Sequence, residues 1–254
     1  MNAPPANAVV VGGDTVIAIG DVHGSLSLLN ALLDALDREH PQAPLIFLGD
    51  MIDRGPSSRQ ALKRAQSAVE ARPGSVILLG NHDEWLVRAI AGDDEAMELW
   101  LPQGGRETLR SFGIDPFQPW QTIRSEMRRR FPDVSAAIAK WPRMVWGDGA
   151  ASDYLFVHAG VDPTTSLHDQ DDNDLIWIRK PFLDWPHVLE RRVVHGHTIE
   201  GRRPVIHAHR IGVDTGAWDT GVLTALILQS GEKPSFLLTD RENGGIILRT
   251  LPHP

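Results

Sequence analysis

Three short apolar runs in the first third of the chain each end in glycine followed by a side chain that can bind a metal ion. The three pairs are Gly20-Asp21, Gly49-Asp50 and Gly80-Asn81. Glycine lets the backbone turn sharply and approach a ligand closely, and in open α/β sheets ligands bind just past the carboxyl ends of the strands. The pattern therefore predicts that three oxygen ligands converge at one edge of a sheet.

Three histidines extend this candidate ligand set. His23 follows Asp21 by two residues, so on an extended backbone both side chains point to the same side. His158 and His197 each follow an apolar run in the second half of the chain. Carboxylate, amide and imidazole ligands without thiolate suit Mn²⁺, Fe or Zn²⁺. A carboxylate such as Asp50 can bridge two cations, which can clamp an anionic centre and activate water.

Groups suited to phosphate chemistry lie beside these ligands. Asp53 and Arg54 follow the second apolar run, His82 follows the third, and Arg179 follows the apolar stretch 175–178. A guanidinium group can donate two parallel hydrogen bonds to two oxygens of a phosphate. A histidine that is not a ligand can protonate a leaving alkoxide, and a neighbouring carboxylate keeps it charged.

Composition limits the classes of protein to consider. The chain has 254 residues, 42% of them hydrophobic, and a net charge of −8, which excludes disorder as the main description. With 25 Lys and Arg against 33 Asp and Glu, it has no basic footprint for nucleic acid. It has no cysteine, which excludes thiolate metal sites and cysteine nucleophiles. No apolar run approaches the roughly 20 residues of a membrane span, and the first residues do not resemble a secretory signal. The cytoplasm is the expected compartment.

The first third alternates strand and helix patterns. Strands are expected over 15–19, 45–48 and 76–79, and helices after Ser25, after Ser57 or Ser58, and from Glu84. This order predicts parallel strands joined by right-handed crossovers. Residues 93–140 favour helices, as an insert that shapes the rim of the site. Strands are expected again at 154–157, 193–194, 211–213, 222–228, 236–238 and 246–248. We expect a single domain over 15–254, preceded by a flexible extension over 1–14.

The motifs resemble those of the PPP-type phosphoprotein phosphatases, within the calcineurin-like metallophosphoesterase superfamily. Segments 20–24, 49–55 and 80–83 are similar to the first three signature motifs, and 157–160 and 195–198 to the later histidine motifs. The resemblance runs from about residue 15 to about residue 228. It implies a central β-sandwich of two mixed sheets flanked by helices.

The resemblance also implies residue roles. One cation would be bound by Asp21, His23 and Asp50, and the other by Asp50, Asn81, His158 and His197. His82 would be the general acid, paired with Asp53, and Arg54 and Arg179 would bind phosphate. Members hydrolyse phosphomonoesters by direct attack of metal-activated water, without a phosphoenzyme. The implied cofactors are two divalent cations, with Mn²⁺ expected ahead of Fe or Zn²⁺.

The resemblance leaves two substrate classes open. Segments 212–217, 223–226 and 104–109 are similar to the bacterial branch, which predicts a serine/threonine phosphatase acting on phosphorylated proteins or peptides, with phosphotyrosine or a small phosphoester as further substrates. The sequences of segments 81–83 and 55–57 also resemble those of the symmetrical dinucleoside tetraphosphate hydrolases. The Asp53-Arg54 pair favours the phosphatases, because the hydrolases usually lack this aspartate.

Other polar groups have simpler interpretations. His207 and His209 are spaced to face one metal, but a hydrogen-bonded strand pair is the expected arrangement. His195 is expected to be structural. Arg128 to Arg130 are expected on a solvated helix face, and the aspartates of 169–174 in a solvated loop. A non-catalytic regulator that kept the fold is a third hypothesis, disfavoured because no metal-binding position is missing.

Overall fold

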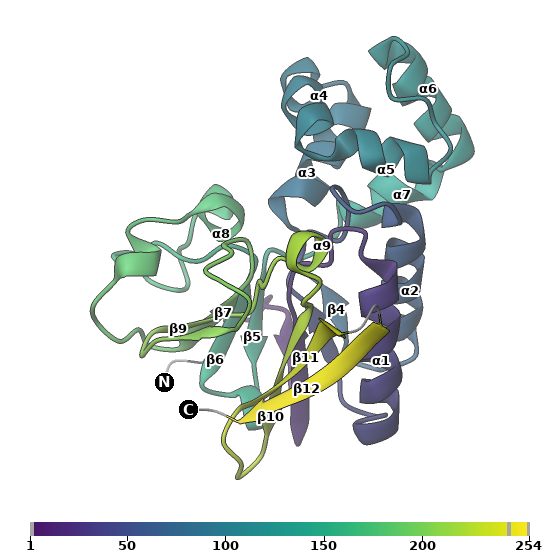
Figure 1. Ribbon diagram of the computed structural model, residues 1–254. Coiled ribbons are helices and arrows are strands. Elements are labelled where there is room, and N and C mark those ends of the chain that lie inside the picture. Colours follow the sequence, from purple (N-terminus) through teal and green to yellow (C-terminus); the bar gives the residue numbers. More distant parts are fainter. Residues whose placement is uncertain (1–2, 243–244, 253–254) are drawn as a thin grey trace.

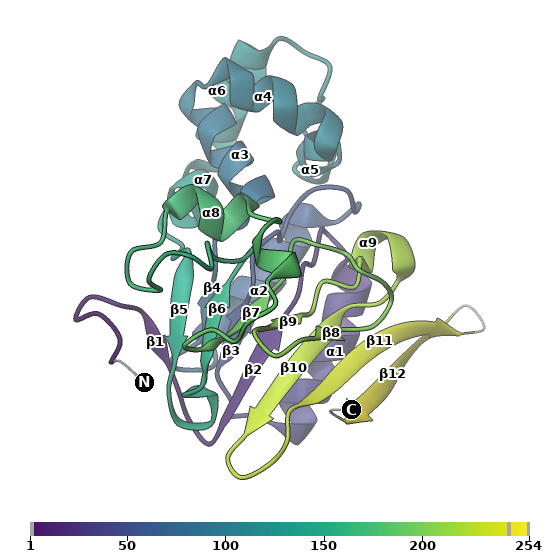
Figure 2. The ribbon, with the colours of Figure 1, turned by 90° about the vertical axis from the view of Figure 1, so that its left-hand side faces the viewer.

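The computed structural model describes residues 3–242 and 245–252. Within them, two six-stranded sheets pack face to face and helices flank them (Figures 1 and 2). The expected β-sandwich of two mixed sheets is therefore confirmed. No helix among the described residues is long and apolar enough to cross a membrane.

The first sheet carries the strands that lead into the first three motifs. Its order is β12-β11-β10-β2-β3-β4. The parallel strands β2 (Thr15–Ile19), β3 (Leu45–Phe47) and β4 (Val76–Ile77) lie side by side, so their carboxyl ends meet at one edge. The remaining strands are antiparallel: β10 (Thr224–Gln229), β11 (Ser235–Glu242) and β12 (Gly245–Pro252).

The second sheet carries the two later histidine motifs. Its order is β1-β5-β6-β7-β9-β8. Strands β6 (Tyr154–Val157), β7 (Arg192–His195) and β9 (Arg210–Gly212) are parallel, whereas β5 pairs antiparallel with β6 and β8 with β9. The others are β1 (Val10–Val11), β5 (Met144–Gly147) and β8 (Val205–Ile206).

Strand β2 is buried on both faces and joins two hydrophobic cores. Val16 and Ala18 point between the sheets, against residues such as Phe156. Ile17 and Ile19 point to the opposite face, against the helices. Because side chains alternate along a strand, a run that is apolar at every position is what a doubly covered strand requires.

Two long helices make the crossovers and cover the outer face of the first sheet. They are α1 (Leu26–Glu39) and α2 (Ser58–Glu70). In α1 the leucines at 28, 29, 32, 33 and 36 are buried, which is the spacing of one helical face. The packing of these helices fixes the positions of the strand ends relative to one another.

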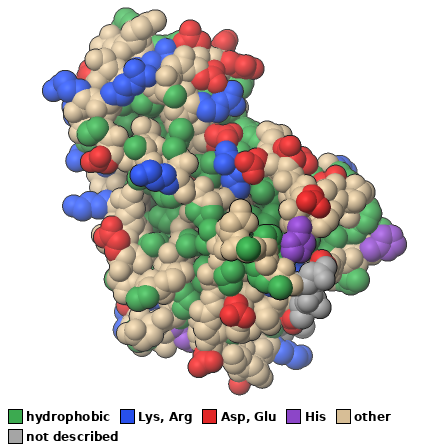
Figure 3. Space-filling view, turned by 180° about the vertical axis from the view of Figure 1, so that it is seen from behind, with side chains coloured by type: hydrophobic (Ala, Val, Ile, Leu, Met, Phe, Trp, Pro, Cys, Tyr) green, Lys and Arg blue, Asp and Glu red, His purple; other side chains and the backbone are tan. Residues whose placement is uncertain are grey.

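A cap of short helices follows β4 and rises above the sandwich (Figure 1). Seen from behind, basic and acidic side chains gather over this upper lobe (Figure 3). Its elements are α3 (Asn81–Ala91), α4 (Asp94–Trp100), η1 (Leu101–Gln103), α5 (Gly105–Ser111), α6 (Trp120–Arg130) and α7 (Pro132–Ile138). The remaining short helices are η2 (Gly149–Ala151), α8 (Asp172–Trp177), η3 (Phe182–Asp184) and α9 (Ala217–Thr220).

Two boundaries differ from the sequence expectation. Helix α3 begins at Asn81 instead of near Glu84, because the Asp83 carboxylate accepts the Gly80 N–H and caps the first turn. The expected flexible extension over 1–14 contains β1, whose two residues pair with β5, so this part of it belongs to the sheet. Residues 1–2 and 253–254 of the expected boundaries lie outside the described residues.

Candidate metal centre and active site

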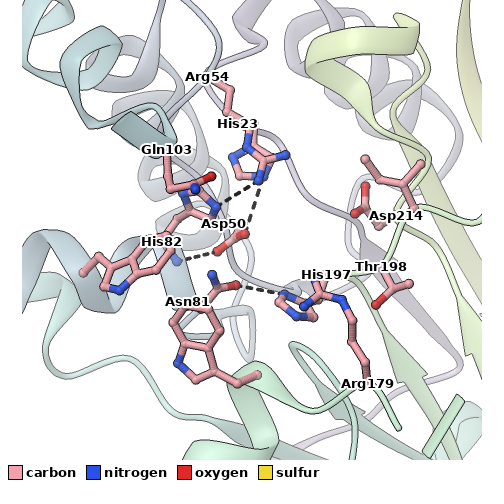
Figure 4. A pocket seen from close by; sticks show the side chains of 13 residues that line it. His23, Asp50, Arg54, Asn81, His82, Gln103, Arg179, His197, Thr198 and Asp214 are labelled. Carbon is pink, nitrogen blue, oxygen red and sulfur yellow. Dashed lines mark hydrogen bonds and ion pairs between the residues drawn. The ribbon is translucent and has the colours of Figure 1, made fainter. Parts of the chain in front are cut away.

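The strand ends of both sheets open into one cavity of about 380 Å³. Figure 4 shows Asp50 near its centre, with His82 and Asn81 on one side and His197 on another. The lining residues are His23, Asp50, Arg54, Asn81, His82, Trp85, Gln103, Trp177, Arg179, His197, Thr198, Ile199 and Asp214. Side chains widely separated in sequence therefore meet at one edge of the sandwich.

The Asp50 carboxylate lies between two groups of candidate ligand atoms. One oxygen is 3.5 Å from His23 Nε2 and the other is 3.5 Å from His158 Nε2. One group consists of His23, Asp50 and His82, and the other of Asp50, His158 and His197, with ligand atoms within 4.8 Å of one another in each. Asp50 belongs to both groups, as a bridging ligand would.

Backbone carbonyls orient two of the histidines. His23 Nδ1 donates to the Ile52 carbonyl at 2.7 Å, and His158 Nδ1 donates to the Leu48 carbonyl at 2.8 Å. Each bond leaves Nε2 of the ring unprotonated and near an Asp50 oxygen. Metal-binding histidines are held in this way. Burial lowers the pKa of His23 to about 3, so the ring is neutral and able to bind a cation.

His197 supplies the test of whether the donors fit a cation. Its Nδ1 lies 2.9 Å from Asn81 Oδ1, which is also 2.9 Å from His158 Nε2. Its Nε2 is buried and has no hydrogen-bond partner within the described part of the chain. Burial lowers the pKa of His197 to about 2, so protonation does not relieve this arrangement. Neutral imidazole rings packed against carboxyl and amide oxygens form a donor set that fits divalent cations.

Asp21 lies at this site but belongs to neither group of close ligand atoms. Its carboxylate accepts the backbone N–H of His197, at 3.1 and 3.2 Å to the two oxygens. Burial and then the neighbouring Asp214 and Asp50 raise its pKa well above the ordinary value. The first group thus contains His82 where the resemblance implies Asp21.

His82 and Asp53 form a buried pair beside Asp50. His82 Nδ1 lies 2.7 Å from an Asp53 oxygen. Burial lowers the pKa of His82, but Asp50 and Asp53 outweigh it, so the pKa lies above its ordinary value. Arg54 approaches His82 Nε2 at 3.1 Å, a contact it can make as a donor while that nitrogen is unprotonated.

The helical cap holds Asp53 in place. Trp100 of α4 donates its indole N–H at 2.9 Å, and Thr108 of α5 donates its hydroxyl at 2.7 Å. Gly104, between them, has a φ of +120°, and a Cβ there would lie 2.4 Å from the backbone nitrogen of Arg54. Only glycine fits at this position, so the cap packs directly against the turn that carries Asp53 and Arg54.

Two tryptophans form an apolar wall of the cavity. The Trp85 ring meets His82 edge-on at 5.0 Å and Trp177 at 4.8 Å between centroids. Trp177 in turn approaches the His197 ring at 6.2 Å. This wall limits water on one side of the candidate ligands. The sequence analysis missed both residues, although Trp85 lies one helical turn after Asn81.

Arg179 lies across the cavity from Arg54 (Figure 4). It is exposed, and within the described part of the chain its side chain has no hydrogen bond or ion pair. The structure therefore brings both predicted phosphate-binding arginines to the cavity, one on each side of Asp50.

Asp214 and Asp83 are buried carboxyl groups near the site that the sequence analysis did not single out. Asp214 lines the cavity and accepts the Gly216 N–H at 2.9 Å. Asp83 accepts the N–H groups of Met51 and Gly80, linking the turns after β3 and β4. The segment 212–217 was a usable signal for Asp214, since it was already noted as a motif.

The other polar candidates lie outside the cavity. His195 Nδ1 contacts the Gly196 carbonyl, and His209 Nε2 donates to the Phe182 carbonyl. His207 is exposed. Arg128 donates to the Ile90 carbonyl and Arg130 to the Gly113 carbonyl. Arg128 and Arg130 are exposed, as a solvated helix face predicts, and their side chains also bond to backbone carbonyls.

The chain thus combines a two-sheet sandwich with a cluster of candidate metal ligands at its strand ends. The family model described as calcineurin-like phosphoesterase matches residues 15–221. The chain belongs to this family.

Several relatives matched by sequence are bacterial proteins named as symmetrical tetraphosphatases. A symmetrical bis(5'-nucleosyl)-tetraphosphatase of Janthinobacterium sp. (strain Marseille) is 40% identical over 152 residues, which cover 60% of this chain and 46% of that protein. One of Ralstonia nicotianae is 43% identical over 156 residues, covering 60% and 44%. The matched part spans less than half the length of these relatives.

Solved structures support the fold. The crystal structure of a putative diadenosine tetraphosphatase has a TM-score of 0.61 at 20% identity, covering 96% of this chain and 98% of that one. A serine/threonine phosphatase from Saccharomyces cerevisiae has a TM-score of 0.56 at 15% identity, covering 97% and 85%. At such identities the likeness shows the fold alone.

Proposed function

We propose that the chain hydrolyses symmetrical dinucleoside tetraphosphates to two nucleoside diphosphates, the reaction named for its bacterial relatives. One observation carries the proposal from the geometry: two arginines, Arg54 and Arg179, flank the Asp50 cluster within a single cavity. Guanidinium groups on both sides suit a chain of consecutive phosphates. This reverses the order expected from sequence, in which a protein phosphatase came first, because the relatives support the tetraphosphatase better.

Two divalent cations are part of the proposal. Asp21, His23 and Asp50 would hold one, and Asp50, Asn81, His158 and His197 the other. Such cations supply Lewis acidity that neutralises phosphate charge and lowers the pKa of water. The shared carboxylate and the unpartnered His197 nitrogen support this assignment.

The residues of the chain then bind the phosphates and move the proton. Arg54 and Arg179 hold phosphate oxygens, which draws Arg54 away from His82. Water attacks the second phosphorus of the tetraphosphate, and the bond from that phosphorus to the bridging oxygen of the third phosphate breaks. His82, held by Asp53, donates its proton from Nε2 to the leaving oxygen, and the attacking water releases its proton to solvent.

Hydrolysis of phosphoserine or phosphothreonine is the second candidate, and the His82–Asp53 pair favours it. A serine alkoxide is a poor leaving group and needs a proton donor, whereas a nucleoside diphosphate leaves more easily. The pair is buried and its carboxylate has two further donors, which is an arrangement suited to a general acid.

A substrate panel separates the two candidates. Purified protein loaded with Mn²⁺ is assayed with diadenosine tetraphosphate and with phosphoserine and phosphothreonine peptides. The proposal expects a higher kcat/KM for the tetraphosphate, with ADP as the sole nucleotide product. Formation of ATP and AMP, or a higher kcat/KM for the peptides, contradicts it.

A further inference from the structure

An exposed apolar ledge lies at the mouth of the cavity. Trp218 is 42% exposed and Ile199 is 41% exposed, although both are large hydrophobic residues. Ile199 lines the cavity directly. Both belong to segments that leave the second sheet, Ile199 just after His197 and Trp218 in α9.

The two side chains belong to one surface. Gly216, which precedes α9, has a φ of +70°, and a Cβ there would lie 3.1 Å from Ile199. The turn into α9 is therefore packed against Ile199. This close approach brings the segment that carries Trp218 next to Ile199.

Arg54 connects this ledge to the reacting centre. Its guanidinium lies 5.1 Å from the centroid of the Trp218 ring. The same group reaches His82 Nε2 at 3.1 Å. A single side chain thus spans from the proposed proton donor to the indole, so a phosphate on Arg54 has an aromatic surface next to it.

We propose that Trp218 and Ile199 form a nucleobase-binding subsite, on which the base of a nucleotide stacks while its phosphates reach Arg54. This inference rests on the proposed function and names the part of the substrate that the phosphate site leaves unbound. Flat bases stack on aromatic side chains, and such stacking tolerates different bases. Guanine nucleotides should therefore bind about as well as adenine nucleotides.

Binding of a matched pair of ligands tests the subsite without relying on turnover. The pair is the α,β-methylene analogue of ADP and methylenediphosphonate, which share a non-hydrolysable diphosphate and differ by the adenosine. Their affinities are measured by calorimetry in Mn²⁺ for the wild type, Trp218→Leu and Trp218→Phe. The control is Phe117→Leu, since Phe117 is also an exposed aromatic beside arginines, but those arginines, Arg106 and Arg110, do not line the cavity.

The subsite makes a selective prediction. Trp218→Leu should weaken the nucleotide analogue roughly 5- to 150-fold, the range of one base–aromatic stack, and change methylenediphosphonate by less than about twofold. Trp218→Phe should restore most of the affinity, and Phe117→Leu should change neither ligand.

Two results overturn the inference. If Trp218→Leu weakens both ligands equally, Trp218 acts only by positioning Arg54; if it weakens neither, the ledge binds no base. Failure of the proposed function is a separate outcome. A wild type that leaves diadenosine tetraphosphate intact, yet binds the nucleotide analogue more tightly than methylenediphosphonate through Trp218, refutes the tetraphosphatase and keeps the subsite.

Discussion

The two sides of the cavity differ in how firmly their arginines are held. On one side Arg54 contacts His82 and Trp218, and the adjoining Asp53 is fully buried with two donors from the cap. On the other side Arg179 is exposed, and its side chain has no partner within the described ranges. One side is preorganised and the other is free to adjust.

This difference suggests a division of labour. Groups that act in the transition state gain from rigid placement, because no reorganisation is needed during the reaction. A group that adapts to the rest of a substrate gains from freedom. We therefore expect substitutions on the Arg54 side to lower kcat, and substitutions on the Arg179 side to raise KM.

The largest effect is expected where the two sides meet. Asp50→Asn removes the negative charge that both ligand groups share, so the loss of kcat should exceed the about 10- to 100-fold typical of residues that only support metal ligands. Metal content measured by mass spectrometry should fall with activity. An active variant with two bound cations would contradict the bridging role.

The next effect is on the preorganised side. His82→Asn should lower kcat about 10²- to 10⁴-fold for substrates with poor leaving groups, because it removes the proton donor. The loss should shrink for p-nitrophenyl phosphate, whose leaving group departs without help. An equal loss for both kinds of substrate would show that His82 is not the proton donor.

A smaller effect tests whether the cap acts through Asp53. Thr108→Val removes a hydrogen bond to a buried carboxylate, which should cost about 1.5–3 kcal/mol of stability and lower kcat with poor leaving groups. Thr239→Val is the matched control, because Thr239 is equally buried and accepts the Leu223 N–H far from the cavity. If the two variants have equal kcat, the cap does not act on the reaction through Asp53.

The smallest effect is expected on the free side. Arg179→Lys keeps the charge and loses only the paired geometry of the guanidinium. KM should rise a few-fold while kcat stays near the wild-type value, as steady-state kinetics with diadenosine tetraphosphate would show. A loss of kcat as large as that of His82→Asn would remove the contrast between the two sides.

Much of the fold was predictable because its signals are local. The alternation of apolar strands and amphipathic helices in the first third identified β2, β3 and β4 with the helices between them. Strand β5 was missed, since its short run of Met144 to Gly147 carries no alternation. Strand β1 was missed because its pairing with β5 is long-range and two residues give no periodic signal.

The candidate site was predictable where motifs mark it, and less so where packing builds it. Strand ends correctly placed Asp50, Asn81 and the histidines near one another. The donors from Trp100 and Thr108 to Asp53 depend on how the cap folds back, which no local pattern reveals. The ledge at Trp218 and the wall at Trp85 likewise arise from contacts between distant segments.

Anomalous scattering from crystals grown with Mn²⁺ tests the central claim most directly. The account predicts two peaks in the cavity, on opposite sides of the Asp50 carboxylate, one beside His23 and the other beside His158 and His197. A cavity without manganese, or peaks that do not touch Asp50, would contradict it.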